Sequence, residues 1–210
     1  MIRYNYVNNM VVKIFEKFEK IEFPVKPEIL LDTIDLLKNC KMMTYKEFAE
    51  INDCSINDVF MLCESKFGCT HYEHKNDRYL VLYNDFVSEY NVGGRIRWTK
   101  AHELGHVLLD HLHNVKTPSA TKGDTEDVLG SFMHHELEAE ANYFAAMFLS
   151  PIPLFEPLEI NSPADIQRTF GLSLGAAVNR WMAYERCYKQ VNVAGFGKQL
   201  RYVYEKKQCF

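Results

Sequence analysis

The sequence predicts an α+β fold that is mostly helical, with one small antiparallel sheet just before a central helix. Apolar residues recur at helical spacing through most of the chain. Two strand-like runs at 69–74 and 78–85 flank the turn-forming segment Lys-Asn-Asp, which predicts a β-hairpin. Two glycines at 93–94 then separate the hairpin from a helix predicted over 96–111.

Further helices are predicted on both sides of these elements. Ahead of the hairpin we expect helices at 7–18, 23–39, 44–52 and 55–67. Behind the central helix we expect a polar loop over 114–131, a helix over 134–149, a proline-punctuated connection over 152–163, and two helices joined by a glycine turn over 163–189.

The composition is that of an ordinary globular protein, because 47% of the 210 residues are hydrophobic and 25% are charged. A chain of this length can bury a core without disulfide bonds. Its six cysteines are scattered without a CxxC pair, so we expect them to be reduced core or incidental residues, and the alternative is a cysteine-based metal site. The sequence shows no secretory signal peptide and no apolar run of membrane-spanning length, which predicts a cytoplasmic protein with no membrane partner.

The central helix carries the motif His102-Glu103-Leu104-Gly105-His106, which fits HExxH. Positions i and i+4 lie about 40° apart on one helix face, so the two imidazoles can converge on one tetrahedral zinc ion. Glu103 lies about 100° from His102, where its carboxylate can take a proton from water beside the metal. Apolar residues line the opposite side of the helix, which predicts a buried, rigid support. The alternative is a helix that contains these histidines by chance.

Three polar residues follow the motif. The longer pattern HExxHxxGxxH is excluded, because leucines stand at 109 and 112. We interpret His111 and His113 as helix-end residues, whose cationic form suits the helix dipole. Asp110 is a candidate acceptor for the free ring N–H of His106, and the alternative is a solvated acid.

A catalytic zinc needs a third protein ligand, and the helix predicted over 134–149 offers three acids. Helix geometry places Glu138 about 60° from the centre of the apolar face and Glu140 about 100° away on the other edge, with Glu136 further out. A carboxylate among alanines is costly unless it is paired or bound to metal, which favours Glu138. Glu140 is the alternative ligand, and a solvated charge is the alternative for each acid.

The same helix supplies candidates for supporting roles. Asn142 lies one turn after Glu138 on the same edge, and we expect its carbonyl to accept the N–H of a ligating histidine. A donor should also stabilise the oxyanion that develops during peptide hydrolysis. Tyr143, His134 and His135 are candidates for that donor, and the sequence does not choose among them.

These two blocks resemble the ImmA/IrrE family of zinc metallopeptidases. The first block reads RWTKAHELGHVLLDH and matches the HELGH helix of the family, and the second reads ELEAEANYFAAMFLSP and matches E-x-x-A-N-x-F-A. The resemblance covers about 95–151 and continues more weakly through FGLSLGAAVNRW. It implies a gluzincin-like site of His102, His106 and Glu138, with Glu103 catalytic. The chain departs from the pattern at Ser150, where Met is usual, and in its longer N-terminal region.

From these observations we expect three regions: an N-terminal helical region over 1–67, a zincin-like catalytic core over 68–151, and a C-terminal helical segment with helix-turn-helix-like spacing over 152–210. The motifs predict a zinc-dependent peptidase, and the family resemblance implies that it cleaves a helix-turn-helix repressor of a phage, a mobile element or a stress response. The alternatives are a zinc-containing toxin- or antitoxin-type protein and a DNA- or protein-binding regulator without peptidase activity.

The distribution of charge along the chain indicates which class of binding partner to expect. The net charge is −4, which argues against strong binding to duplex DNA. Residues 163–210 nevertheless carry 8 Lys and Arg against 3 Asp and Glu, a local net charge of +5. Such a segment can steer an acidic protein, so we expect a protein partner rather than nucleic acid. The family resemblance implies that this partner is a repressor-like or antitoxin-like protein.

Overall fold

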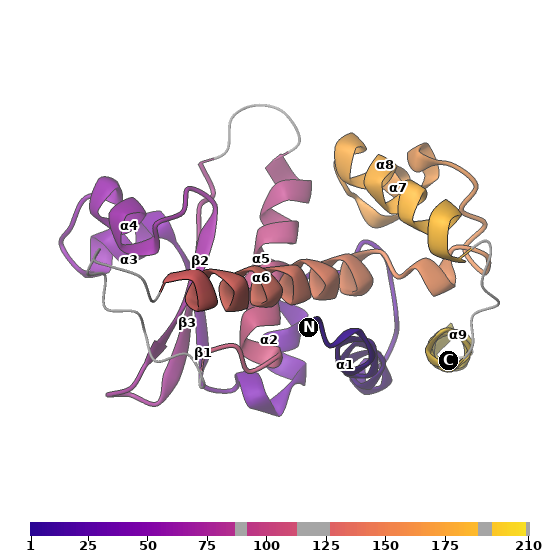
Figure 1. Cartoon of the computed structure of the whole chain (residues 1–210), viewed down its shortest axis with the longest axis horizontal. Coiled ribbons are helices and arrows are strands. Elements are labelled where there is room, and N and C mark those ends of the chain that lie inside the picture. The colour runs from indigo at the N-terminus through magenta and orange to yellow at the C-terminus, as the bar shows by residue number, and fades with distance from the viewer. Residues whose placement is uncertain (87–91, 113–126, 189–194, 209–210) are drawn as a thin grey trace.

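Two long helices, α5 and α6, cross at the centre of the molecule, and the other elements are arranged around them (Figure 1). The computed structural model describes residues 1–86, 92–112, 127–188 and 195–208. α5 spans Val92–Leu108 and α6 spans Asp127–Leu149. The predicted boundaries were therefore wrong at three ends, since α5 begins at Val92 rather than near position 96 and stops before His111, and α6 begins well before position 134.

The predicted hairpin is confirmed. β2 (Gly68–Glu73) and β3 (Arg78–Tyr83) pair antiparallel, with Gly68 opposite Tyr83. The sheet also contains a strand that was not predicted, β1 (Cys40–Thr44), which lies parallel to β3. The strand order is β1-β3-β2, so the sheet is mixed rather than purely antiparallel. β1 carries Lys and Met rather than strong strand formers, and pairing with β3 determines its conformation.

The N-terminal helices that follow the first one are shorter than predicted. α1 spans Tyr4–Lys17, but the helix expected over 23–39 is reduced to α2 (Ile29–Thr33) and the 3-10 turn η1 (Asp35–Leu37). Ile34 between them has extended backbone angles, as suits a β-branched residue. α3 (Tyr45–Ile51) and α4 (Ile56–Cys63) each begin with a capping box, in which the N-cap hydroxyl and an acid three residues later exchange hydrogen bonds.

The C-terminal part is helical, as predicted. It comprises η2 (Ile152–Leu154), α7 (Pro163–Phe170), α8 (Leu174–Ala183), the π-helical turn η3 (Tyr184–Tyr188) and α9 (Phe196–Gln208). Gly171 has φ +62° and makes the turn between α7 and α8. The segment thus has the helix–turn–helix spacing read from the sequence.

The main hydrophobic core lies between α5, α6, α1 and the C-terminal helices. Fully buried residues from these elements meet there, including Phe15, Leu104, Phe148, Phe170 and Leu200. A smaller core lies on the other face of the sheet, beneath α3 and α4 (Figure 1). Among the described residues, no helix combines the length and the hydropathy that crossing a membrane requires.

The smaller core contains a disulfide bond, which corrects the expectation that the cysteines are unpaired. Cys63 at the end of α4 is bonded to Cys69 on β2. The two residues are only six positions apart in sequence, so the bond ties α4 directly to the strand that follows it. β2 is therefore held from both of its faces, by the disulfide on one and by α5 on the other.

Candidate metal centre

Three donor side chains converge where α5 and α6 cross. His102 Nε2 and His106 Nε2 lie 3.1 Å apart. Glu138 on α6 places Oε2 3.2 Å from His102 Nε2 and Oε1 3.3 Å from His106 Nε2. Ligands of a tetrahedral ion with bonds of about 2.0–2.1 Å lie roughly 3.3 Å apart. The three side chains therefore form a group that could hold such a metal ion.

The electrostatics of the group follow from this convergence. Contact with the imidazoles of His102 and His106 holds the pKa of the Glu138 carboxyl well below its usual range. Burial acts to lower the pKa of His102, but Glu138, Glu103 and Asn142 outweigh it and raise that pKa. Glu138 is thus a carboxylate at neutral pH, as a metal ligand must be.

Asn142 lies one turn after Glu138 on α6 and reaches the far side of His102. Its Oδ1 is 3.2 Å from His102 Nδ1. A side-chain carbonyl oxygen only accepts hydrogen bonds, so this contact favours the tautomer with hydrogen on Nδ1. In that tautomer Nε2 of His102 can offer its lone pair to a metal ion held between His106 and Glu138.

Glu103 lies beside the three donors and is almost fully buried, with 7% of its surface exposed. Thr70 on β2 donates from Oγ1 to Glu103 Oε2 over 2.7 Å, and the same hydroxyl lies 3.1 Å from the Glu103 backbone oxygen. Burial raises the pKa of the Glu103 carboxyl, against the opposing effect of the two histidines. Thr70 could not be identified from the sequence, because its contact with Glu103 depends on the packing of β2 against α5.

Gly68 explains how β2 approaches α5 so closely. A β-carbon at this position would lie 2.5 Å from Thr99 Cγ2 and 3.1 Å from Glu103 Oε1. Contacts under 3.0 Å are not tolerated, so only glycine lets the strand lie against this turn of the helix. The carboxylate of Glu103 is therefore enclosed by the strand.

The side chain that contacts Nδ1 of His106 is His111 rather than the candidate Asp110. Asp110 has φ +58° and ends α5 in a Schellman motif, with His111 N bonded to His106 O and Asp110 N bonded to Val107 O. This turn folds the chain back, so that His111 Nδ1 lies 3.0 Å from His106 Nδ1. Asp110 itself is exposed.

His111 is also not the cationic helix-end residue that the sequence suggested. It is buried, and burial together with nearby His106 lowers its pKa to about 4, so it is neutral at neutral pH. His113 lies outside the described residues. The signal that could have indicated the turn is an aspartate after a leucine pair, since Asp tolerates the left-handed conformation.

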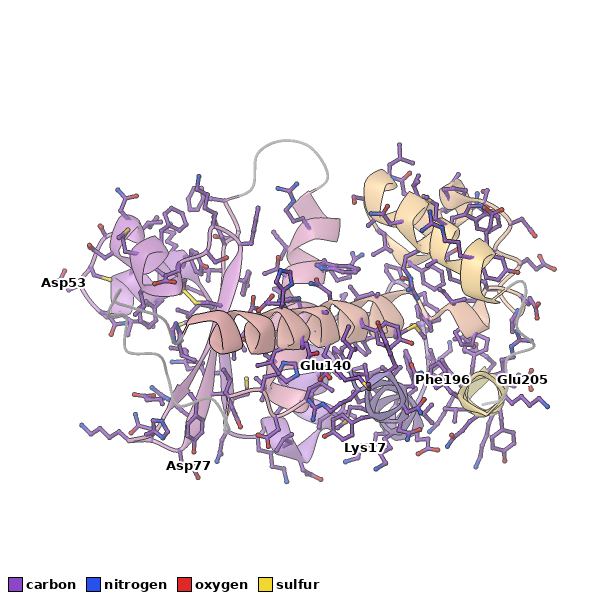
Figure 2. The ribbon with its side chains drawn as sticks, viewed as in Figure 1. Lys17, Asp53, Asp77, Glu140, Phe196 and Glu205 are labelled. Atoms are coloured by element: carbon purple, nitrogen blue, oxygen red, sulfur yellow. A yellow bond between two sulfur atoms is a disulfide. The ribbon has the colours of Figure 1, made fainter. Side chains whose placement is uncertain are left out.

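Glu140, the alternative ligand, faces away from the three donors and binds Arg3. Its Oε2 accepts from Arg3 Nη2 over 2.7 Å, and its Oε1 accepts from the Arg3 backbone N over 2.6 Å. His111 Nε2 lies 3.2 Å from Oε2. Figure 2 shows Glu140 on the side of α6 that faces α1. Burial acts to raise the pKa of Glu140, but the bonds from Arg3 and His111 lower it overall.

The remaining candidates are Glu136 and the three possible oxyanion donors, and all of them belong to α6. Tyr143 donates from its hydroxyl to Asn8 Oδ1 on α1 over 2.9 Å. His135 is exposed, and the side chain of His134 lies outside the described part of the structure. Glu136 is half-exposed and pairs with the amino group of Met1.

A second group of metal-binding residue types lies on the far face of the sheet. Cys63, Cys69 and His71 each place a donor atom within 4.8 Å of the others. The two sulfur atoms are bonded to each other in the disulfide, so they are not thiolate ligands in this state. Burial lowers the pKa of His71, which is therefore a neutral imidazole at neutral pH.

A cavity of about 750 Å³ opens beside the metal ligands. Helices α1, α5, α6 and α8 enclose it, and Asn142, which contacts His102, forms part of its wall. Trp98, Tyr143 and Leu172 give the wall an apolar character, and Arg95 and Arg180 add positive charge. The cavity is large enough to accept a side chain of a peptide.

The HExxH helix, the crossing helix that brings a third ligand, and the buried glutamate between them define the protein as a metallopeptidase-type protein. Comparison with known families agrees with this class. The profile of the IrrE N-terminal-like domain, peptidase family M78, matches residues 68–182. The chain belongs to this family, which confirms the family resemblance read from its motifs. No curated protein matches the chain.

Proposed function

We propose that the protein is a zinc-dependent endopeptidase, in which His102, His106 and Glu138 hold the ion and Glu103 is the general base. The observation that carries this proposal is the position of Glu103. Its carboxylate is buried beside the three donor atoms without being one of them, and Thr70 orients it. Burying an acid costs free energy, and a site that only stored metal would not need one there.

The chemistry assigns a task to each oxygen of Glu103. Bound zinc would supply Lewis-acid activation of water and of the scissile carbonyl. Thr70 already bonds Oε2, so Oε1 accepts a proton as the water oxygen bonds to the carbonyl carbon. Glu103 returns that proton to the nitrogen as the C–N bond breaks, which releases an amine and a carboxylic acid. Burial of Glu103 disfavours its charged form, which favours acceptance of a proton by its carboxylate.

Two neighbouring features suit an extended peptide. Within the described residues β2 pairs with a strand on one side only, so its other edge can bond to a peptide backbone. The cavity beside Asn142 offers Trp98 and Leu172 to an apolar side chain of the same peptide. These features favour a peptide substrate over a small molecule.

We further propose that the natural substrate is a helix-turn-helix repressor of a phage, a mobile element or a stress response in the cytoplasm. The resemblance to the ImmA/IrrE family supports this, since its members cleave such repressors. The net charge of +5 over 163–210 favours an acidic protein surface. On α8, Leu174, Val178 and Met182 form an exposed apolar row that suits contact with a protein.

The same row argues against the alternative of a DNA-binding regulator. A recognition helix presents polar and basic side chains to base edges and phosphates. α7 and α8 have helix-turn-helix spacing, but the row on α8 is apolar at three positions spaced four residues apart. A protein-docking role for this helix pair therefore fits its surface better than a DNA-binding role.

The test is co-expression with a small repressor-like protein encoded beside the gene in the native host. Wild type should produce repressor fragments on a gel, and Glu103→Gln should reduce cleavage by roughly 10²–10⁴-fold, the usual contribution of general acid–base catalysis. Zinc content and fold should be unchanged in Glu103→Gln, because the residue is not a ligand. Glu136→Gln on the exposed side of α6 is the matched control and should retain activity.

Each other outcome has a definite meaning. Loss of zinc in Glu103→Gln would make the residue a ligand or a structural group. Unchanged cleavage would assign the base to another residue. Absence of cleavage by wild type with every neighbouring repressor, across metals and inducing conditions, would overturn the peptidase proposal in favour of a metal-containing regulator or toxin-type protein.

A further inference from the structure

A continuous line of contacts runs from the start of α1 to the metal ligand His106. Arg3 precedes α1 and binds both carboxylate oxygens of Glu140. Glu140 Oε2 lies 3.2 Å from His111 Nε2, and His111 Nδ1 lies 3.0 Å from His106 Nδ1. The side chains of Glu140 and His111 are only 3% and 1% exposed. Water therefore has little access to compete for these bonds.

The direction of each hydrogen bond follows from the chemistry of its partners. A carboxylate that is paired with a guanidinium accepts hydrogen bonds and donates none. His111 Nε2 must then carry the hydrogen in its contact with Glu140. A neutral imidazole has one donor and one acceptor, so His111 Nδ1 is the acceptor. The hydrogen in the last contact consequently belongs to His106 Nδ1, and His106 Nε2 keeps its lone pair.

We propose that His111 is a positioning residue, which the Arg3–Glu140 ion pair holds in one tautomer and which in turn fixes His106 in the tautomer that binds metal through Nε2. This inference rests on the proposed zinc site and adds to it a residue before α1. Arg3 lies outside the residues 68–182 that match the family profile. The N-terminal segment thus contributes to a site whose ligands all lie within the matched region.

The contrast with the other histidine ligand explains why a buried ion pair is needed. His102 Nδ1 faces the Asn142 carbonyl oxygen, which can only accept, so a single contact sets its tautomer. His106 Nδ1 faces another imidazole, which can be either donor or acceptor at that nitrogen. The ambiguity is removed only by a group on the far side of His111 that can only accept. Glu140 is that group, and Arg3 keeps it ionised.

The first test measures zinc affinity of the full chain by competition with a chromophoric chelator. His111→Leu removes the acceptor at similar volume, and we expect zinc to bind about 10–100-fold more weakly. His111→Asn keeps a carbonyl oxygen at the position of Nδ1 and should recover most of the affinity. Leu and Asn are both unable to bond to Glu140, so a purely structural effect would weaken zinc binding equally in the two variants. Equal affinities in wild type and His111→Leu would overturn the proposal.

The second test requires no substitution. Two-bond nitrogen–proton correlations in histidine-labelled full-length protein show which ring nitrogen carries hydrogen. We expect His106 to carry it on Nδ1 in the zinc-loaded protein, and to keep it there after zinc is removed with a chelator. Hydrogen on Nε2 after zinc removal would overturn the proposal, because the protein would then not preset the tautomer.

The outcomes separate this inference from the proposed function. A protein with hydrogen on His106 Nδ1 that cleaves no repressor supports the positioning role and overturns the peptidase. An active peptidase whose zinc affinity is unchanged in His111→Leu supports the proposed function and overturns the positioning role of His111.

Discussion

Gly105 on α5 lies directly against the ring of Phe144 on α6, and a β-carbon at position 105 would come within 2.9 Å of Phe144 Cδ1. The crossing of the two helices that brings Glu138 to His102 and His106 depends on this contact. Phe144 is fully buried and stacks on Phe148, so its ring has no room to retreat.

Replacement of this glycine should therefore destabilise the protein. Gly105→Ala overpacks the crossing, at a typical cost of about 1–3 kcal/mol, and recovers at most about 1 kcal/mol of helix propensity. Gly175→Ala on α8 is the matched control, since a β-carbon there meets nothing within 4 Å. Urea unfolding should show a lower free energy of unfolding for the first variant and an equal or higher one for the second. The opposite order would mean that the helices do not cross at Gly105.

A second prediction concerns the zinc content of variants that lack a metal ligand. We expect about one zinc per purified chain, and substantial loss of zinc in His102→Ala, His106→Ala and Glu138→Ala, because two ligands hold a catalytic zinc poorly. Glu136→Ala, two residues away on the exposed side of α6, should keep its zinc. Metal analysis by mass spectrometry is the measurement. Full occupancy in Glu138→Ala would remove that residue from the ligand set.

A third prediction concerns Thr70. Its replacement should distinguish the orientation of the general base Glu103 from the binding of metal. Thr70→Val keeps the shape of the side chain but removes the bond to Glu103 Oε2. A hydrogen bond to a charged group contributes about 1.5–3 kcal/mol, so cleavage should slow by roughly 10-fold or more while zinc content stays at the wild-type level. Thr70→Ser keeps the hydroxyl and should retain most of the activity. Equal rates in the two variants would count against a role for this bond.

A fourth prediction concerns the dependence of stability on pH. The bonds from Arg3 and His111 outweigh burial and lower the pKa of Glu140 in the folded protein. The ionised group therefore stabilises the fold fully above its unfolded pKa of about 4.3, and this contribution is lost as the pH falls through the folded value. Wild type should exceed Glu140→Gln in free energy of unfolding at pH 7, and the difference should shrink toward pH 3. Urea unfolding of zinc-free protein at several pH values measures this, and a difference independent of pH would contradict it.

Local geometry explains what could be predicted about the site. The positions of His102, Glu103 and His106 around one helix follow from the helical repeat alone, as does the choice of Glu138 over Glu136. The burial argument for Glu138 was incomplete, however. Its side chain is 38% exposed, whereas that of Glu140 is only 3% exposed. Glu140 can be buried because Arg3, the residue before α1, binds its carboxylate. The sequence carries no signal for a contact between residues so far apart.

The other differences also arise from non-local contacts or from a turn. β1 is a strand because β3 lies beside it, not because its own residues favour that state. Thr70 binds Glu103 because Gly68 lets β2 lie against α5. His111 was assigned to the end of a helix, and the left-handed Asp110 instead turns it back beneath His106.

The order of the ligands along the chain has a consequence for biosynthesis. The ribosome delivers both imidazoles of α5 before α6 is made, and Glu138 and Glu140 follow together on α6. A nascent chain that ends before α6 therefore exposes two histidines without the carboxylate that completes the ligand set. Arg3 has left the ribosome long before its partner Glu140, which lies 137 positions later. Completion of the metal-ligand set and formation of the Arg3–Glu140 ion pair are thus both deferred to the emergence of α6, so a translation product that ends before α6 lacks the assembled site.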